Sequence, residues 1–587
     1  MNLSARNKLL IGTLIILVSV GGFLRLKDLA RQDMQTDDAT YSFRAIGYFD
    51  YIASENKQST PVTWFAEPQW WQSLSFHDAP PLVFATQWAF FHIGGDSAFM
   101  ARLPFALTGI ASIISMFLLG QAFGDTAVGL VAAGALAIMN YHVWISRIGY
   151  LESFLVLWII LALYFFLRAR DKENNYFGWA AMLACGMLTK YSFLFLFPVF
   201  AVPLFWWRRK AWKRSKFVGA LAVFFVLISP ILIYNVMMFQ TRGHFDAALS
   251  TLVGMHPADF VGLTRTAGSV TNAFAALPAI AGTIAENTSL GFLALILLCM
   301  IIVAVRDYRD YREKKDLERP YLLWSGLLWA VLALTVMGMS DRFGTIIIPF
   351  LALVTGIGVM TAWNGLAGWR RKIFIILVAL AAAGELFYTV QTQLMLYPIV
   401  TNSFFLSANR PSFQGYAELE NYVQDFYARF PDPSYVVFTK TPQIFAYQAK
   451  IINDIYDSGV DKPQQTHLLI FDDRMDWFAT LWTFEKRRLY DVATIPSIGQ
   501  FISGVSTGGA QQFAHYGFTD VTIIAGENDA YPATDSFRPI HDFVANLAAT
   551  QAPVDKITNP YGKTVFNVYT LPLTDAALKP LLAEPAK

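Results

Sequence analysis

Charged residues are scarce in this 587-residue sequence, at 15% of the chain, whereas a soluble globular protein carries roughly 25%. Hydrophobic residues reach 55% and aromatic residues 15%. The formal net charge is only +2, so no global basic field would attract nucleic acid. This composition excludes an ordinary soluble domain, and the length indicates a membrane protein with more than one domain.

The usual motifs of metal, redox and nucleotide chemistry are also missing. The two cysteines, Cys185 and Cys299, lie in apolar runs, and no CxxC motif or Cys/His cluster occurs. A zinc or thiol–disulfide centre is therefore not expected. The sequence has no GxGxxG or Walker pattern and no evident repeat. The apolar stretch near residue 10 lacks a small-residue cleavage site, which favours an uncleaved first span over a signal peptide.

Long apolar runs are abundant. Since a helix needs about 20 apolar residues to cross the hydrocarbon core, the runs predict a mostly α, polytopic bundle of about eleven transmembrane helices. The predicted spans are 8–26, 103–122, 127–145, 149–168, 175–189, 190–207, 217–237, 288–305, 320–338, 343–363 and 373–392.

Basic residues predict the orientation of these spans, because short cytoplasmic loops collect Lys and Arg. Basic segments precede the first span and recur at 168–172, 208–216, 306–319 and 370–372. With the predicted spans, all of them lie on the side of the N-terminus. We therefore expect a multi-pass, N-in, C-out protein. The plasma (inner) membrane is the expected location, and a protein of the endoplasmic reticulum would show the same pattern of basic loops.

Two domains are expected: a transmembrane catalytic domain at 1–400 and a soluble extracytoplasmic α/β domain at 401–587. The first has long outer loops at about 27–102 and 238–287. In the second, "GYAELENYVQDFYARF" predicts an amphipathic helix. The segments "SYVVFTK", "HLLIFDD", "DVTIIAGE" and "TVFNVYTL" predict strands. This alternation favours a small α/β sandwich.

Candidate site residues are ionisable groups near outer helix ends, because charge at membrane depth is costly. The first outer loop opens with "MQTDDATYSFRAIGYF", in which Asp37 and Asp38 are adjacent. A carboxylate here could act as a general base on an acceptor hydroxyl. The alternative is a helix N-terminus that Thr36 or Asp37 caps, with acidic residues in the first turn.

A second polar segment, "SFHDAPPLVFATQW", places His77 and Asp78 before Pro80 and Pro81, which fix a rigid entry into a helix. This segment is equally explained as a loop-to-helix boundary. A divalent metal is the less favoured possibility, since no spacing demands one, and no cofactor is expected. The residues that could supply its oxygen and nitrogen ligands are Asp37, Asp38, His77, Asp78, Glu152 and His244.

Several Lys and Arg residues lie at predicted outer helix ends, although these residues usually collect in cytoplasmic loops. Each alone is explained by a side chain that reaches up to lipid head groups. As a ring around an acidic pair they suit a lipid-borne phosphate, which Arg binds bidentately and Lys binds as a point charge. The residues are Arg102, Arg147 near Glu152, Lys190, Arg242 near His244, and Arg342.

These segments together resemble the GT-C glycosyltransferases, especially the protein O-mannosyltransferase and lipid A aminoarabinose transferase branches. "TDDATY" resembles their Asp-Glu/Asp-x-x-Tyr opening, and "HDAPPL" looks like their (Asp/Lys)-x-Pro-Pro-Leu segment. "ARLPFAL", "SRIGYLESF", "LTKYSFLFLFP" and "DRFGTIIIPFLAL" look like the helix-mouth segments that follow. The likeness runs in order over about 20–365.

The resemblance implies an inverting, metal-independent transfer of a sugar from a polyprenyl- or dolichyl-phosphate donor. The acceptor would be an extracytoplasmic hydroxyl on a protein, a lipid or a cell-envelope glycan. By this resemblance, Asp37 would be the general base, and Asp38 would orient Asp37 or the acceptor. The residues that would bind the leaving lipid phosphate are Arg102, Lys190 and Arg342.

Supporting roles are expected for Arg147 paired with Glu152, and for His77, Asp78, Arg242 and His244. The chain departs from the family where many relatives carry Lys or His immediately before the two prolines, because it has Ala79. The phosphate contact of that position is then missing, or His77 or another cation makes it. Asp38 in place of Glu is a smaller departure.

A transporter or lipid flippase is the alternative from another class. Transporters usually place ionisable residues near the midplane of the bilayer, on broken helices in two related halves. The predicted charges here cluster at one face without two-half symmetry, which favours the enzyme. A non-catalytic scaffold whose working part is the C-terminal domain is a third hypothesis, and it predicts that Asp37 and Asp38 are dispensable.

Overall fold

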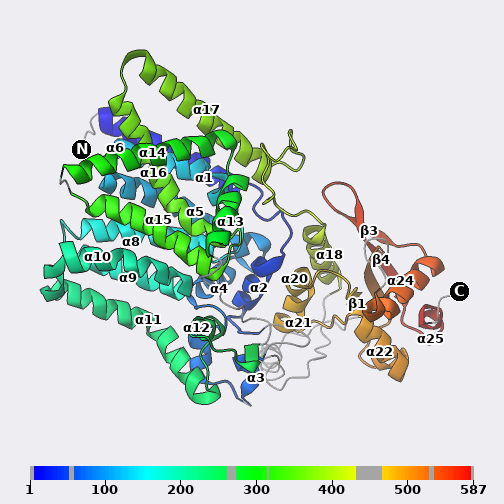
Figure 1. The fold of residues 1–587 in the computed structure, drawn as a ribbon. Helices are drawn as coiled ribbons and strands as arrows, with labels where there is room; N and C mark the ends of the chain where they lie inside the picture. Colours follow the sequence, from blue (N-terminus) through cyan, green and yellow to red (C-terminus); the bar gives the residue numbers. More distant parts are fainter. Residues whose placement is uncertain are drawn as a thin grey trace. The chain divides into compact units, whose positions relative to one another are not determined.

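The computed structural model describes residues 5–51, 59–65, 67–260, 273–313, 316–430, 448, 466–527 and 534–582 (Figure 1). The chain forms two compact units. The first unit contains Met1–Leu29, Asn56–Ser59 and Gln69–Pro411. The second unit contains Ala30–Glu55, Thr60–Pro68 and Ser412–Lys587. Much of the loop after the first helix, including the acidic pair, therefore packs with the C-terminal part of the chain.

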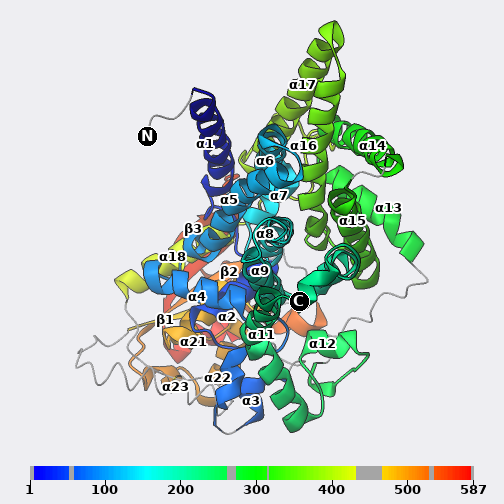
Figure 2. The ribbon, with the colours of Figure 1, turned by 90° about the vertical axis from the view of Figure 1, so that its left-hand side faces the viewer.

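The first unit is a bundle of helices that confirms a multi-pass membrane protein (Figures 1 and 2). Seven of its described helices are long and apolar enough to cross a membrane, and a bent pair gives an eighth candidate. The seven are α1 (Ala5–Leu26), α5 (Ala98–Phe123), α11 (Ser215–Arg242), α14 (Leu290–Arg312), α15 (Glu318–Met337), η7 with α16 (Phe343–Ile347 and Ile348–Gly365) and α17 (Gly368–Gln393). The bent pair is α6 (Thr126–Ile138) and α7 (Asn140–Ser146), which meet at 63°.

The other three predicted spans do not form single helices of 18 residues or more. Two of them are the helices α8 (Glu152–Arg168) and α9 (Asn175–Thr189). Residues 190–207 divide into η2 (Tyr191–Leu196), α10 (Phe197–Val202) and η3 (Pro203–Trp207). Pro198 is the second residue of α10 and Pro203 is the first residue of η3, positions where the missing N–H of proline is tolerated. The predicted count of eleven, and the N-in, C-out orientation that depends on it, are therefore not confirmed.

Short elements connect these helices. Those before α5 are α2 (Thr36–Ile46), α3 (Pro61–Trp64), η1 (Trp70–Leu74) and α4 (Leu82–Gly94). Those that follow η3 are η4 (Arg209–Lys213), α12 (Ala247–Leu252), η5 (Ala258–Phe260) and α13 (Ala273–Glu286). Helix α4 begins directly after Pro81, as the two prolines predicted.

The break between α6 and α7 is stabilised by a buried arginine. The guanidinium of Arg25, which is 0% exposed, donates to the carbonyls of Leu136 (3.2 Å) and Ala137 (3.0 Å). Its Nη2 atom also lies 2.7 Å from Nδ1 of His142. Each unsatisfied backbone group within a bilayer costs several kcal/mol. The hydrogen bonds from Arg25 therefore lower the free-energy cost of the bend between the two helices.

Replacing Arg25 with methionine is expected to lower the melting temperature of the detergent-solubilised protein. Each carbonyl left without a donor costs about 1–3 kcal/mol. Lys27→Met is the matched control, because the side chain of Lys27 is half exposed and forms an ion pair with its neighbour Asp28. Its melting temperature should stay close to that of the wild type, and a wild-type melting temperature for Arg25→Met would contradict the role assigned to Arg25.

A buried glutamate secures the other side of the same break. Glu385 of α17 is 0% exposed and accepts from the backbone N–H groups of Asn140 and Ser289, both at 2.8 Å. Asn140 begins α7 and Ser289 is the N-cap of α14. One carboxylate therefore satisfies donors at two helix N-termini, which have no partners within their own helices.

The second unit contains a mixed four-stranded sheet in the order β1-β2-β4-β3. Strands β1 (His467–Phe471) and β2 (Asp520–Gly526) are parallel, and β4 (Thr564–Pro572) runs antiparallel to β2 and to β3 (Asp555–Thr558). Side chains alternate between the two faces of a strand. One face packs on α22 (Ile498–Gly508) and α24 (Arg538–Thr550), and the other packs on α18 (Tyr416–Arg429).

This arrangement confirms a small α/β sandwich and three of the four predicted strands. The predicted strand at 434–440 lies outside the described residues, and β3 was not predicted. The remaining elements of the unit are α20 (Trp477–Thr480), η8 (Leu481–Glu485), α21 (Lys486–Tyr490), α23 (Gln511–Ala514), η10 (Asp535–Phe537), α25 (Asp575–Leu578) and η11 (Lys579–Leu582).

Candidate functional site

An ion pair in the first unit joins the ends of two adjacent helices. Glu152 is the first residue of α8, and Lys190 is the C-cap of α9, which packs against α8. The Nζ atom of Lys190 lies 2.5 Å from Oε1 of Glu152, whose side chain is 2% exposed. The other oxygen of Glu152 is buried and has no hydrogen-bond partner among the described residues. It is a free acceptor beside a cation.

A second cation shares an aromatic ring with Lys190. The Nζ atom of Lys190 lies 4.1 Å from the ring centre of Phe343, and the guanidinium carbon of Arg342 lies 5.0 Å from it. Arg342 also lies over the ring of Tyr150, at 5.6 Å. The structure thus brings together two of the three cations that the sequence proposed for a phosphate.

Arg102 and Arg147 are instead neighbours around the end of α1. Arg102 donates to the carbonyl of Leu29 (3.1 Å), and Arg147 donates to those of Leu24 (2.9 Å) and Lys27 (2.8 Å). Burial, and then the positive charge of Arg102, lower the pKa of Arg147 to about 10. Cations commonly bind the last carbonyls of a helix.

The predicted pairing of Arg147 with Glu152 is not formed, because Glu152 pairs with Lys190. The sequence placed Arg147 and Glu152 close together along the chain. Helix α7 ends at Ser146 and α8 begins at Glu152, with a turn between them. Arg147 therefore contacts the end of α1, whereas Glu152 pairs with the C-cap residue of α9.

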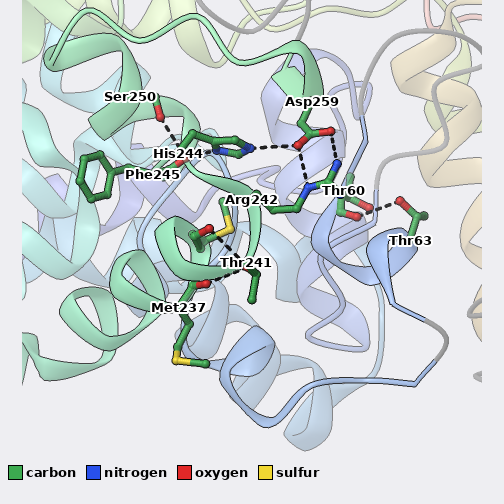
Figure 3. Close-up of polar contacts among 10 residues, drawn as sticks. Thr60, Thr63, Met237, Thr241, Arg242, His244, Phe245, Ser250 and Asp259 are labelled. Carbon is green, nitrogen blue, oxygen red and sulfur yellow. Dashed lines mark hydrogen bonds and ion pairs between the residues drawn. The ribbon is translucent and has the colours of Figure 1, made fainter.

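The loop after α11 holds a compact charged triad (Figure 3). Arg242 donates to both carboxylate oxygens of Asp259, at 2.6 and 2.9 Å, and Nε2 of His244 lies 2.9 Å from the same carboxylate. Burial alone would raise the pKa of Asp259, but the hydrogen bonds from Arg242 and His244 outweigh it and lower that pKa. Arg242 and His244 were predicted from the sequence, whereas Asp259 was not. Asp259 lies 15 residues beyond His244.

His77 and Asp78, in the segment before α4, also contact this loop. The ring of His77 stacks on Phe260 at 5.5 Å, and its carbonyl accepts from the N–H of Ala247 (2.7 Å). Nδ1 of His77 lies 3.9 Å from Asp78. Both residues therefore lie in packed positions, as expected of a loop-to-helix boundary.

A buried aspartate links the loop after α11 to the residue after Lys190. Asp246 caps α12 through Leu249 N–H (2.7 Å) and accepts from Tyr191 Oη (2.6 Å) and Asn235 (2.8 Å). Burial raises the pKa of Asp246, against these hydrogen bonds, and nearby Asp78 raises it further. This network places the loop beside the Lys190 turn. No sequence pattern pointed to Tyr191 or Asn235.

The acidic pair belongs to the second unit, in the first turn of α2. The expected helix N-terminus is present, but Gln35 occupies the N-cap in place of Thr36 or Asp37. Asp38 is 2% exposed, whereas Asp37 is half-buried and accepts from Tyr41 Oη at 3.2 Å. Asp37 is thus the more accessible of the two carboxylates.

Comparisons with known proteins identify the fold of the chain. The family model described as dolichyl-phosphate-mannose-protein mannosyltransferase matches residues 78–234. The crystal structure of ArnT from Cupriavidus metallidurans in the apo state has a TM-score of 0.52 at 14% identity, over 99% of this chain and 100% of that one. The chain therefore has the fold of ArnT, and part of its first unit matches the mannosyltransferase family model.

Two further solved structures match the chain. ArnT bound to undecaprenyl phosphate matches it with a TM-score of 0.52 at 14% identity, over 96% of this chain and 98% of that one. The archaeal oligosaccharyltransferase AglB from Archaeoglobus fulgidus, in complex with an inhibitory peptide and a dolichol-phosphate, has a TM-score of 0.48 at 12% identity, over 98% and 78%. A comparison with curated protein sequences found no match.

The family model covers only part of the candidate site. Among the predicted residues it includes Asp78, Arg102, Arg147, Glu152 and Lys190. Asp37, Asp38 and Arg342 lie outside it. The match to the family model therefore does not depend on the acidic pair, whose role is proposed below.

Proposed function

We propose that this protein is a glycosyltransferase that moves a sugar from a polyprenyl-phosphate donor to a hydroxyl group on the extracytoplasmic side of the plasma (inner) membrane. The observation that carries the proposal is the convergence of Lys190 and Arg342 on the ring of Phe343. Both residues lie at helix ends, beside the start of α8. Two cations at such a position suit a lipid-linked phosphate whose sugar projects out of the bilayer.

The two cations bind the phosphate in different ways. The guanidinium of Arg342 presents planar donors to two phosphate oxygens, and Lys190 acts as a point charge. In the transition state the phosphate gains negative charge as the bond to the sugar breaks, so fixed cations stabilise it more than the ground state. The partnerless Oε2 of Glu152 accepts a hydrogen bond from a hydroxyl of the bound sugar.

Asp37 is the general base of the proposed reaction. It takes the proton of the acceptor hydroxyl while the hydroxyl oxygen attacks the anomeric carbon. The bond between that carbon and the phosphate oxygen breaks on the opposite face, which inverts the configuration and releases polyprenyl phosphate. Tyr41 holds the Asp37 carboxylate, and buried Asp38 orients it or the acceptor.

The acceptor class is a hydroxyl of a protein, a lipid or a cell-envelope glycan, and the transfer needs no metal. Lys190 supplies to the phosphate the positive charge that a divalent cation supplies in other transferases. Glu152 and His244, two of the six possible metal ligands, are already engaged by Lys190 and Asp259.

The test is to offer the purified full-length protein a panel of undecaprenyl- and dolichyl-phosphate sugars and to follow the free polyprenyl phosphate released. Slow transfer to water reports donor use even before the acceptor is identified. We expect release with at least one sugar, unchanged by EDTA. Loss of release in EDTA would contradict metal independence. No release with any sugar or acceptor, together with lipid scrambling or solute transport in liposomes, would favour the transporter hypothesis.

A further inference from the structure

Asp33 fastens the segment before α2 to the C-terminal part of the second unit. One oxygen of its buried carboxylate accepts from the N–H of Gln414 (2.5 Å), and the other accepts from that of Ala417 (2.9 Å). Its own N–H donates to the carbonyl of Ser412 (3.0 Å). Helix α18 has Gly415 at its N-cap, which provides no side-chain cap. Asp33 thus caps a helix that begins almost four hundred residues further along the chain.

The far end of α2 is held by the same part of the chain. The hydroxyl of Tyr490 donates to the carbonyl of Phe43 (2.7 Å), and the two rings lie 5.6 Å apart. Phe43 is 1% exposed and is buried against Leu481 and Leu489. The eleven-residue helix α2 is therefore attached to the C-terminal segment at both of its ends.

The backbone between Asp33 and the acidic pair is strained. Thr36 has a φ of 56°, in the left-handed region that a β-branched residue rarely adopts. Such a conformation persists only where the surrounding contacts impose it. The hydrogen bonds of Asp33 lie three residues before Thr36, and Asp37 follows Thr36 directly. Release of the Asp33 contacts would therefore let this turn relax and shift the Asp37 carboxylate.

We infer that Asp33 is a positioning residue for sugar transfer, through which the C-terminal segment sets the place of the acidic pair. This inference rests on the proposed role of Asp37. A displacement of about 1 Å in a reacting group can lower the rate about 10²-fold. Asp33 acts on the general base without touching the donor, so it affects kcat and leaves donor affinity unchanged.

Asp33→Ala in the full-length protein tests this inference. We expect kcat for release of polyprenyl phosphate to fall about 10- to 100-fold, with the donor KM within about twofold of the wild type. Asp33→Asn keeps one acceptor oxygen and should recover part of the loss. In the Asp37→Asn background, Asp33→Ala should cause no further loss, because residues that act through one another are non-additive.

Asp473→Ala is the matched control. Asp473 also caps a helix of the second unit from outside that helix, through the N–H of Gly499 in α22 (2.8 Å). Asp473→Ala should destabilise the second unit about as much as Asp33→Ala does, but its kcat should stay at the wild-type value. Wild-type kcat in Asp33→Ala, an equal loss in Asp473→Ala, or an additive loss in the Asp37→Asn background would overturn the inference.

Hydrogen exchange of the α2 amides separates this inference from the proposed function. Asp33→Ala should speed exchange in Thr36–Ile46, and Asp473→Ala should not. If the wild type turns over no donor, the proposed function fails while faster exchange still supports the structural coupling. If exchange in α2 is unchanged in Asp33→Ala, the inference fails whatever the activity of the protein.

Discussion

Asp37→Asn is expected to lower kcat for sugar transfer by about 10²- to 10⁴-fold, the usual contribution of a general base. Asparagine has nearly the same shape and can still accept the hydrogen bond from Tyr41. It cannot take a proton from the acceptor hydroxyl. Release of polyprenyl phosphate at saturating donor measures the effect, and the donor KM should change little because the proposed phosphate contacts are made by Lys190 and Arg342.

Tyr41→Phe is the matched control for Asp37→Asn. It removes only the hydroxyl that holds the carboxylate, at 3.2 Å, so kcat should fall less than tenfold, which corresponds to about 1.4 kcal/mol. Full activity of Asp37→Asn would move the general base to Asp38 or Glu152. Full activity of both Asp37→Asn and Asp38→Asn would support the hypothesis of a non-catalytic scaffold.

Lys190→Met is expected to impair both stability and donor binding. It leaves the carboxylate of Glu152 buried without its partner, and breaking a buried pair in this way costs about 3–5 kcal/mol. It also removes one proposed cation from the lipid phosphate. A hydrogen bond to a charged group contributes about 1.5–3 kcal/mol, so donor affinity should fall about 10- to 150-fold.

The double variant Lys190→Met/Glu152→Gln separates these two effects. Neutral glutamine in place of Glu152 removes the unpaired charge, so the melting temperature should recover towards that of the wild type. Donor affinity should stay low, because the phosphate contact is still missing. If the double variant binds an undecaprenyl-phosphate sugar as tightly as the wild type, Lys190 pairs only with Glu152 and has no role in donor binding.

Local patterns in the sequence predicted the helices and most of the sheet. Apolar runs placed the long helices of the bundle close to their observed positions, and alternation placed β1, β2 and β4. They did not predict the helices α4, α12 and α13, which lie in the segments expected to be outer loops. Residues 190–207 are apolar enough for a span, yet they consist of three short segments, two of which have a proline within their first two residues. Strand β3 is four residues long and, among the described strands, pairs with β4 alone, so no alternation could reveal it.

The sequence by itself determined that the protein crosses a membrane several times, that strands follow the apolar helices, and which charged residues lie near helix ends. Those properties follow from composition and from periodicity, which each segment carries alone. The tertiary structure decided the partners: Glu152 with Lys190, Arg147 with the end of α1, and Asp33 with α18. Each of these pairs joins residues far apart in the chain. A charged group that is buried away from water destabilises the folded protein unless it is paired. Its partner is therefore whichever group the fold brings close to it.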